Sequence, residues 1–296
     1  MMGIIMGMTW KEMLRKRVMV LTLLMTLIFL LAFWFVASSL GKHGIPEGRW
    51  GMGNSELLIA KFTNGTIILT LGFFFGSFVL AFLAIFSSFS AIAGEAEQGV
   101  LQALLPRPLP RWKWYLGRWL GFITLGLGYA LLLYVAIMLI TKFHAAIPMD
   151  PTAWIQSFLL FASAVPMLVT VSMLGSSWFS ALGNGVFMTM LYGAGWLGGM
   201  IEKLSTSIGL EPEIMNSLKN MTGVISLLMP VDGLQRKMLS ELFNLKELGG
   251  VVSLQTAAFG INSFANVPSG TFVMYGAGYT IVAFLLGLWI FGRKDL

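Results

Sequence analysis

Long uncharged apolar runs alternate with polar segments along the whole chain. Each run is long enough to cross a hydrocarbon layer ~30 Å thick as an α-helix, which takes ~20 residues. The fold class that this pattern predicts is an all-α membrane protein, a single membrane domain over residues 1–296. The six expected transmembrane spans are residues 18–40, 66–93, 119–141, 153–175, 183–201 and 271–291.

The polar segments between the runs predict the orientation of the chain. Basic residues gather in an entry segment (1–17), in the loop 94–118 and at Arg293 and Lys294 after the last run. Short basic segments next to spans favour the cytoplasmic side, so both termini are expected there.

Two longer regions then fall on the outer side, Gly41–Gly65 and residues 202–270. In the second region, Pro212 and Pro230 each precede a predicted helix. The helix after Pro230 has one apolar face and one polar face. Such a helix is expected at the outer interface or as a cap on the bundle.

The composition agrees with the membrane class. The chain is 57% hydrophobic and 11% charged, far from the values of soluble domains. The first run is too long for the core of a signal peptide, so we expect it to be retained. The absence of cysteine excludes disulfides and zinc–thiolate clusters. The net charge of +6 fits the basic anchoring segments, and no basic stripe with interleaved aromatics suggests nucleic acid. We therefore expect a multi-pass protein of the cell (cytoplasmic) membrane.

Several kinds of chemistry have no matching residues in the sequence. The six runs contain no Asp, Glu, Lys, Arg or His, which argues against an ion-coupled transporter. Sodium sites made of carbonyls and hydroxyls stay open. His43 and His144 fall in separate predicted loops, and no Gly-x-x-x-x-Gly-Lys-Ser/Thr motif is present. We expect no catalytic residue, no metal site and no cofactor in this chain.

The loop 94–118 holds the most specific pattern. Glu95 and Glu97 begin a short predicted helix, where acidic residues favour the helix dipole. Leu101, Leu104 and Leu105 give that helix an apolar face. Two interpretations fit: a docking helix for a soluble partner, or an interfacial loop that only anchors two spans.

This segment resembles the signature of the type 2 family of ABC exporter permeases, Glu-x-Glu-x-Gly-Thr-Leu-x-x-Leu-Leu, then Pro and Arg, then Leu-Gly-Lys-x-x-Gly. Val100 and Arg118 replace the family's Thr and Lys, and Pro106 and Pro110 are additional. The matching positions are Glu95, Glu97, Gly99, Leu101, Leu104, Leu105, Pro108, Arg111, Leu116, Gly117 and Gly121.

Two weaker matches lie elsewhere. Trp10, Lys11 and Glu12, with Arg17, are similar to the family's basic entry helix. The segment 228–232 resembles an Asn-Pro-x-Asp segment of the branch that includes the nitrous-oxide-reductase maturation permeases, with Met229 in place of Asn.

The resemblance implies a permease subunit that moves its substrate outward. Its partners would be two separate ABC ATPase subunits, which bind ATP and Mg²⁺, and a second permease, either another copy in a homodimer or a different chain. Residues 95–105 would form the coupling helix, with Glu95 and Glu97 as polar contacts and Leu101 and Leu104 on the buried face. The alternative function is a non-transport membrane scaffold or assembly factor that holds a soluble partner on the same loop. The substrate stays open.

Small and polar residues inside the runs complete the candidates. Gly72 with Gly76, and Gly195 with Gly199, have the four-residue spacing that lets helices approach closely. These glycines suit a subunit interface, a substrate path or packing within the chain. Asn184, at the start of the fifth run, suits a helix cap or a substrate contact.

Overall fold

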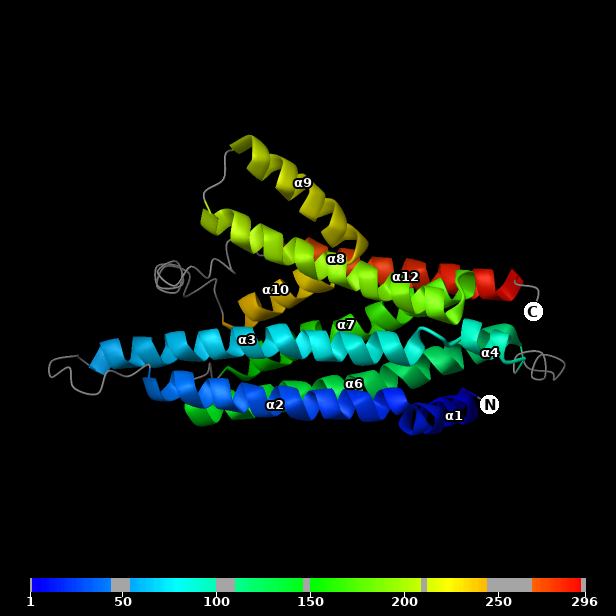
Figure 1. Cartoon of the computed structure of the whole chain (residues 1–296), viewed down its shortest axis with the longest axis horizontal. Helices are drawn as coiled ribbons and strands as arrows, with labels where there is room; N and C mark the ends of the chain where they lie inside the picture. The colour runs from blue at the N-terminus through cyan, green and yellow to red at the C-terminus, as the bar shows by residue number, and fades with distance from the viewer. Residues whose placement is uncertain are drawn as a thin grey trace.

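The computed structural model describes residues 2–43, 54–99, 110–145, 150–208, 212–243 and 268–293. In these residues the secondary structure is helical, which confirms the all-α class for them. The helices lie lengthwise beside one another, except that α9 diverges from the bundle (Figure 1). Their bounds are α1 Met2–Arg15, α2 Arg17–His43, α3 Asn54–Ser88, α4 Ala93–Glu97, α6 Arg111–His144, α7 Pro151–Trp178, α8 Ala181–Ile208, α9 Pro212–Leu228, α10 Val231–Leu242 and α12 Gly270–Arg293.

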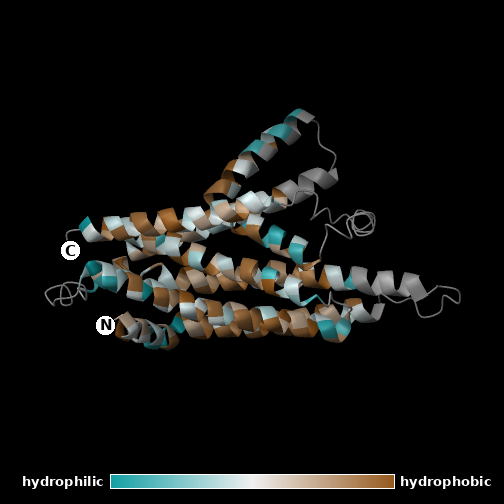
Figure 2. Ribbon diagram, turned by 180° about the vertical axis from the view of Figure 1, so that it is seen from behind, coloured by the Kyte–Doolittle hydropathy of each residue, from teal (hydrophilic) through white to brown (hydrophobic). Residues whose placement is uncertain are grey.

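Five of the described helices, α2, α3, α6, α7 and α12, are long and apolar enough to cross a membrane. Figure 2 shows their middle parts as largely hydrophobic, with hydrophilic residues towards the helix ends. The chain is therefore a multi-pass membrane protein. The predicted run 183–201 lies within α8, which is not among these five helices, so the sixth span stays a prediction.

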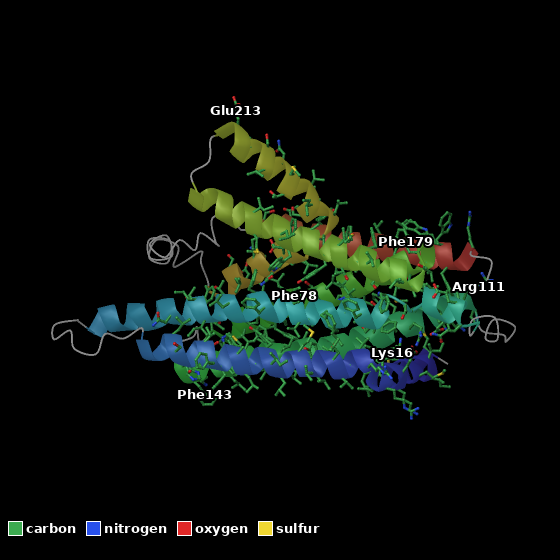
Figure 3. The ribbon with its side chains drawn as sticks, in the orientation of Figure 1. Lys16, Phe78, Arg111, Phe143, Phe179 and Glu213 are labelled. Carbon is green, nitrogen blue, oxygen red and sulfur yellow. The ribbon has the colours of Figure 1, made fainter. Side chains whose placement is uncertain are left out.

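One end of the bundle carries α1, α4 and the end of α12 (Figure 1). Figure 3 labels Lys16 and Arg111 at this end and Phe143 at the opposite end. From α4 the chain runs away along α6 and back along α7, and α8 then leads towards the opposite end again.

The helices α9 and α10 form a hairpin that returns into the bundle. Helix α9 packs along α8, where Ile225 faces Gly198. Tyr275 and Tyr279 of α12 donate hydrogen bonds from their hydroxyls to the carbonyls of Leu227 (2.7 Å) and Leu228 (2.9 Å). These carbonyls belong to the last turn of α9, which lacks partners within its own helix. The chain then turns at Met229 and Pro230 into α10.

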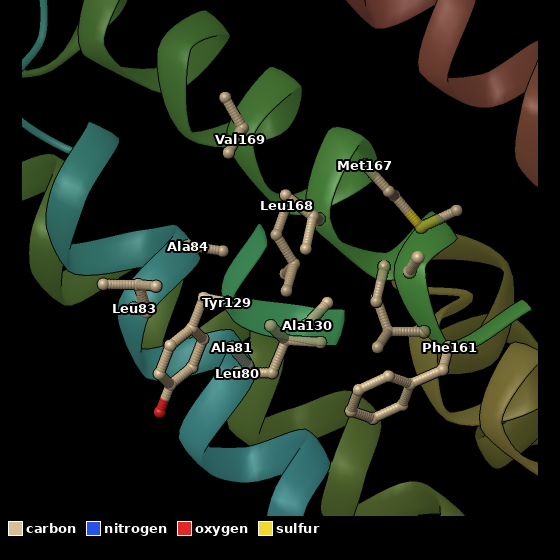
Figure 4. Close-up of a cluster of buried hydrophobic side chains, with 14 of the residues drawn as sticks. Leu80, Ala81, Leu83, Ala84, Tyr129, Ala130, Phe161, Met167, Leu168 and Val169 are labelled. Atoms are coloured by element: carbon tan, nitrogen blue, oxygen red, sulfur yellow. The ribbon is translucent and has the colours of Figure 1, made fainter. Parts of the chain in front are cut away.

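Part of the buried apolar core lies where α3, α6 and α7 meet. Leu80 and Leu83 of α3, Ala130 of α6 and Leu168 of α7 are buried there (Figure 4). The predicted glycine pair Gly72 and Gly76 packs within the chain: a Cβ at either position would collide with Ile137 of α6, and at Gly72 also with Phe33 of α2.

Several helix boundaries differ from the expected ones. Helix α3 begins at Asn54 rather than at residue 66, and α6 begins at Arg111 rather than at residue 119. Backbone hydrogen bonds continue a helix past its apolar part, so hydropathy alone understates helix length. The helix expected over 95–105 is not continuous. Helix α4 ends at Glu97, and Gly99 has a φ of 70°, which breaks the helical path.

The position of α10 also differs from the expectation. The sequence predicts a helix at the outer interface or on top of the bundle. In the structure α10 packs mainly on α7, and its polar residues Asp232, Gln235, Arg236 and Lys237 are buried together with its apolar face. Leu234 lies near Gly276, six residues into α12, so the first turn of α10 is inside the bundle.

Candidate functional site

The short helix α4 is held at its beginning by a side chain from α7. Its first N–H groups lack intrahelical acceptors, as at every helix N-terminus, and Ile92 offers no side-chain cap. The hydroxyl of Ser176 accepts hydrogen bonds from the backbone N–H of Ile92 (3.1 Å) and of Ala93 (3.0 Å). The start of α4 is thereby fixed to the end of α7.

The end of α4 is held by α8. The carboxylate of Glu97 accepts a hydrogen bond from the backbone N–H of Ala181, the first residue of α8, at 2.9 Å. A carboxylate at a helix N-terminus also interacts favourably with the helix dipole. Nearby, the fully buried side-chain amide of Asn184 donates to the carbonyls of Phe89 (2.7 Å) and Ser172 (2.8 Å). The segment around α4 is therefore bound to both α7 and α8.

A buried arginine connects α4 to α1 and α6. The guanidinium of Arg118, on α6, forms ion pairs with Glu95 of α4 and with Glu12 of α1. The Arg118 side chain is only 5% exposed, and its guanidinium lies 5.5 Å from the ring centre of Trp114 and 5.6 Å from that of Phe122. Arginine suits this place because its planar head can contact two carboxylates and stack on aromatic rings.

The glycines on either side of Arg118 let α1 approach α6 closely. A Cβ on Gly117 would lie 2.9 Å from the Cβ of Ile5, and one on Gly121 would lie 2.7 Å from the Cβ of Thr9. Ile5 and Thr9 are buried on the face of α1 that meets α6. The indole N–H of Trp10 adds a hydrogen bond to the hydroxyl of Thr124, at 2.9 Å.

The charge of Glu12 is stabilised by this arrangement. Partial burial alone would raise the pKa of its carboxyl. The charges of Arg118 and Lys16, together with hydrogen bonds from both, outweigh that effect and lower the pKa below its ordinary value of 4.5. Lys16 Nζ lies 2.7 Å from the Glu12 carboxylate. Glu12 is thus held ionised at neutral pH.

We call this set of residues the α4 junction: Glu12, Glu95, Glu97, Arg118, Ser176, Ala181 and Asn184. It joins five helices at the end of the bundle that also carries α1 and the end of α12. A displacement of α4 would act on α1, α6, α7 and α8 together. The junction has the geometry of a mechanical connection, since its contacts are ion pairs, hydrogen bonds and close packing.

A second polar cluster lies on α10. Asp232 pairs with Arg236 at 3.0 Å, and Lys237 pairs with Glu241 at 2.8 Å. Asp232 lies against Gly199 of α8, and Met229 lies against Gly195. The predicted glycine pair Gly195 and Gly199 therefore contacts the beginning of α10 and the turn before it. Ionisable side chains buried within a membrane bundle are costly and mark functional candidates. The apolar runs contain no ionisable residue, but the burial of α10 places ionisable side chains inside the bundle.

A comparison with protein-family models gives a match over residues 5–296, nearly the whole chain, to the model described as ABC-2 family transporter protein. The chain belongs to the ABC-2 transporter family. No curated protein matches it in sequence. The family match agrees with the resemblance found at residues 94–121. It does not distinguish the maturation-permease branch suggested by residues 228–232, which stays a prediction.

The residues that match the permease signature do not all fall within the described part of the chain. Glu95, Glu97 and Gly99 lie in or directly after α4, and Arg111 begins α6, where its guanidinium donates to the carbonyl of Gly292 at 3.2 Å. Of the entry-helix residues, Glu12 joins the junction, whereas Lys11 and Arg17 are exposed. Leu101, Leu104, Leu105 and Pro108 lie outside the described residues.

Sequence reasoning missed three contributors to the junction. In the sequence, Arg118 is noted only as the residue that replaces the family's Lys. A basic residue between two glycines on a predicted helix, here Gly117 and Gly121, could have indicated a close ionic contact with another helix. Ser176 and Ala181 carry no signal of their own, because a serine near a helix end and a helix N–H are common. Their role follows only from the contact with α4.

Proposed function

We propose that the chain is the permease subunit of an ABC exporter and that a separate ATPase subunit docks on the loop 94–111. One observation supports this most strongly. The segment that resembles the permease signature is also the place where α1, α4, α6, α7 and α8 meet, in a chain of the ABC-2 family.

The proposed mechanism passes movement from the ATPase to the membrane helices. ATP and Mg²⁺ bind to the partner, and this chain hydrolyses no ATP itself. When the ATPase subunits close around ATP, they displace the docked loop. Because Ser176 and Ala181 hold the two ends of α4, and Arg118 holds Glu95, that displacement moves α6, α7 and α8 with it.

The same proposal includes six spans and a cytoplasmic α4 junction. Helix α7 ends beside α4, and α12 starts nearer the opposite end, so α8 has to carry the chain across. The basic entry segment, loop 94–118 and C-terminus then share the cytoplasmic side. Two copies of the chain with two ATPase subunits would complete an exporter in the cell membrane, with the substrate moving outward.

Variants of Glu97 test the proposal, because its carboxylate also supports α8. Glu97→Gln keeps an oxygen acceptor for the N–H of Ala181 but removes the charge, whereas Glu97→Lys removes both. The tagged complex is purified from membranes, and ATP hydrolysis is measured. We expect the wild-type complex to hydrolyse ATP and Glu97→Gln to lower the rate several-fold in a protein that melts like the wild type.

The outcomes separate the two functions. If both variants hydrolyse ATP at the wild-type rate, Glu97 does not contribute to the docking contact. A stable partner that hydrolyses no ATP would favour the scaffold or assembly factor, which holds a soluble protein on this loop without transport.

A further inference from the structure

A cavity of about 340 Å³ lies between α7 and α12. Helix α7 lines it with Ser163, Pro166 and Met167, and α6 and α10 add Trp119 and Leu234. The α12 residues that line it are Val273, Gly276, Ala277, Thr280, Ile281 and Phe284. A volume of this size falls within the range of small-molecule sites. We call it the α7–α12 groove.

The polar groups of the groove already have acceptors for their hydrogens. The Ser163 hydroxyl donates to the carbonyl of Leu160 (2.7 Å), and the Thr280 hydroxyl donates to that of Gly276 (2.8 Å). The indole N–H of Trp119 donates to the hydroxyl of Thr170 at 2.8 Å. The groove therefore presents apolar surface and no free donor, which selects an apolar ligand.

The dimensions and the opening of the groove indicate which apolar ligand. The stretch from Val273 to Phe284 is about 16 Å long at 1.5 Å per residue, close to half of a hydrocarbon layer of ~30 Å. Ile281 lines the groove and is 60% exposed, and its neighbours Val282 and Leu285 are also exposed. The groove is thus continuous with the apolar surface of α12 that the bilayer covers.

We propose that the α7–α12 groove is a binding site for one hydrocarbon chain of a membrane lipid, which enters sideways from the bilayer. The chain fills the space between α7 and α12 and contacts Trp119 and Leu234. This proposal concerns the chain by itself and is independent of any ATPase partner.

A matched pair of substitutions on α12 tests it. Ala277 lines the groove and is exposed, so Ala277→Phe fills the groove. The adjacent Gly278 is also exposed, with nothing within 4 Å of a Cβ built there, so Gly278→Phe adds the same ring elsewhere on the helix. The purified chain is placed in phosphatidylcholine vesicles that contain a phosphatidylcholine with a photoreactive diazirine in the middle of one acyl chain.

After irradiation, the cross-linked residues are located by mass spectrometry. We expect the groove residues to be labelled several-fold more than the exposed residues of α2, with this excess lost in Ala277→Phe and kept in Gly278→Phe. Equal labelling of the groove and α2, or an unchanged excess in folded Ala277→Phe, would overturn the proposal.

A second measurement, the quenching of tryptophan fluorescence, keeps the proposal testable if Ala277→Phe does not fold. Phosphatidylcholine with brominated acyl chains quenches nearby tryptophans. Comparison with Trp119→Phe isolates the signal of Trp119, and Trp289→Phe isolates that of Trp289, which is 55% exposed. We expect both tryptophans to be quenched. Quenching of Trp289 without quenching of Trp119 would show that no lipid chain occupies the groove.

Discussion

At the scale of single residues, Arg118 is the centre of the α4 junction. It is nearly buried and pairs with carboxylates from two other helices, Glu12 and Glu95. A buried ion pair adds little net stability over an apolar replacement of similar volume, but removing one partner alone leaves a costly uncompensated charge. The arrangement therefore makes the position of α4 depend on α1 and α6.

Replacing Arg118 tests this dependence. Arg118→Met is expected to destabilise the chain by about 3–5 kcal/mol, the usual cost of removing one partner of a buried pair. Arg118→Lys should cost less, because it keeps a positive charge, although it loses the planar head that contacts two carboxylates. Thermal melting of the purified chain in detergent measures both. Equal stability of Arg118→Met and the wild type would contradict the role given to Arg118.

The lowered pKa of Glu12 predicts a pH dependence of stability. A carboxyl whose pKa is lower in the folded than in the unfolded state stabilises the fold above the unfolded pKa. This stabilisation disappears as the pH falls through the folded pKa, which lies below 4.5. The difference in melting temperature between the wild type and Glu12→Gln should therefore be positive at pH 7 and shrink towards zero as the pH falls below the ordinary value of 4.5 and through the lowered pKa of Glu12. A difference that stays constant over this range would rule out the effect.

At the scale of helices, the close contact between α1 and α6 depends on Gly117 and Gly121. Gly121→Leu should displace α1, because a side chain there collides with Thr9. Trypsin would then cleave faster after the exposed residues Lys11 and Arg15 of α1. Gly128→Leu on the same helix is the control, since a Cβ there meets nothing within 4 Å. If the two variants are cleaved at the same rate, the glycines do not position α1.

The buried pair of α10 predicts an unequal effect of single and double substitutions. Arg236→Met leaves Asp232 as a buried carboxylate that has lost its pairing arginine, at a cost of about 3–5 kcal/mol. Combining it with Asp232→Asn removes that charge, so the double variant should melt at a higher temperature than Arg236→Met alone. A double variant that is as unstable as the sum of the two single changes would show that the pair is not coupled.

The helices themselves could be predicted well from the sequence, and their surroundings could not. Apolar runs identify α2, α3, α6, α7 and α12, and Pro212 and Pro230 mark the starts of α9 and α10. The pattern of α10 shows an apolar and a polar face but does not say what covers the polar face. Likewise, the acids of the loop 94–118 are visible in the sequence. The sequence does not show that Arg118 and the N–H of Ala181 are the partners of these acids, because the contacts join residues far apart in the chain.

At the scale of the whole molecule, ion pairs and hydrogen bonds connect several helices at one end of the membrane bundle. The α4 junction lies at that end, with α1 and the end of α12 (Figure 1). In the proposed exporter an ATPase docks there, and α10 packs on α7 inside the bundle. The proposed exporter requires contact between the loop after α4 and an ATPase.

Site-specific photo-cross-linking in the native membrane tests this contact. A photoreactive amino acid is placed at Gln98, which is exposed directly after α4, and in a control at Phe143, which is 82% exposed at the opposite end of α6. We expect the photoreactive residue at position 98 to capture a protein with a P-loop ATPase sequence, and the one at position 143 not to capture it. Capture of no ATPase at Gln98, in a chain that is present and folded in the membrane, would contradict the proposed contact.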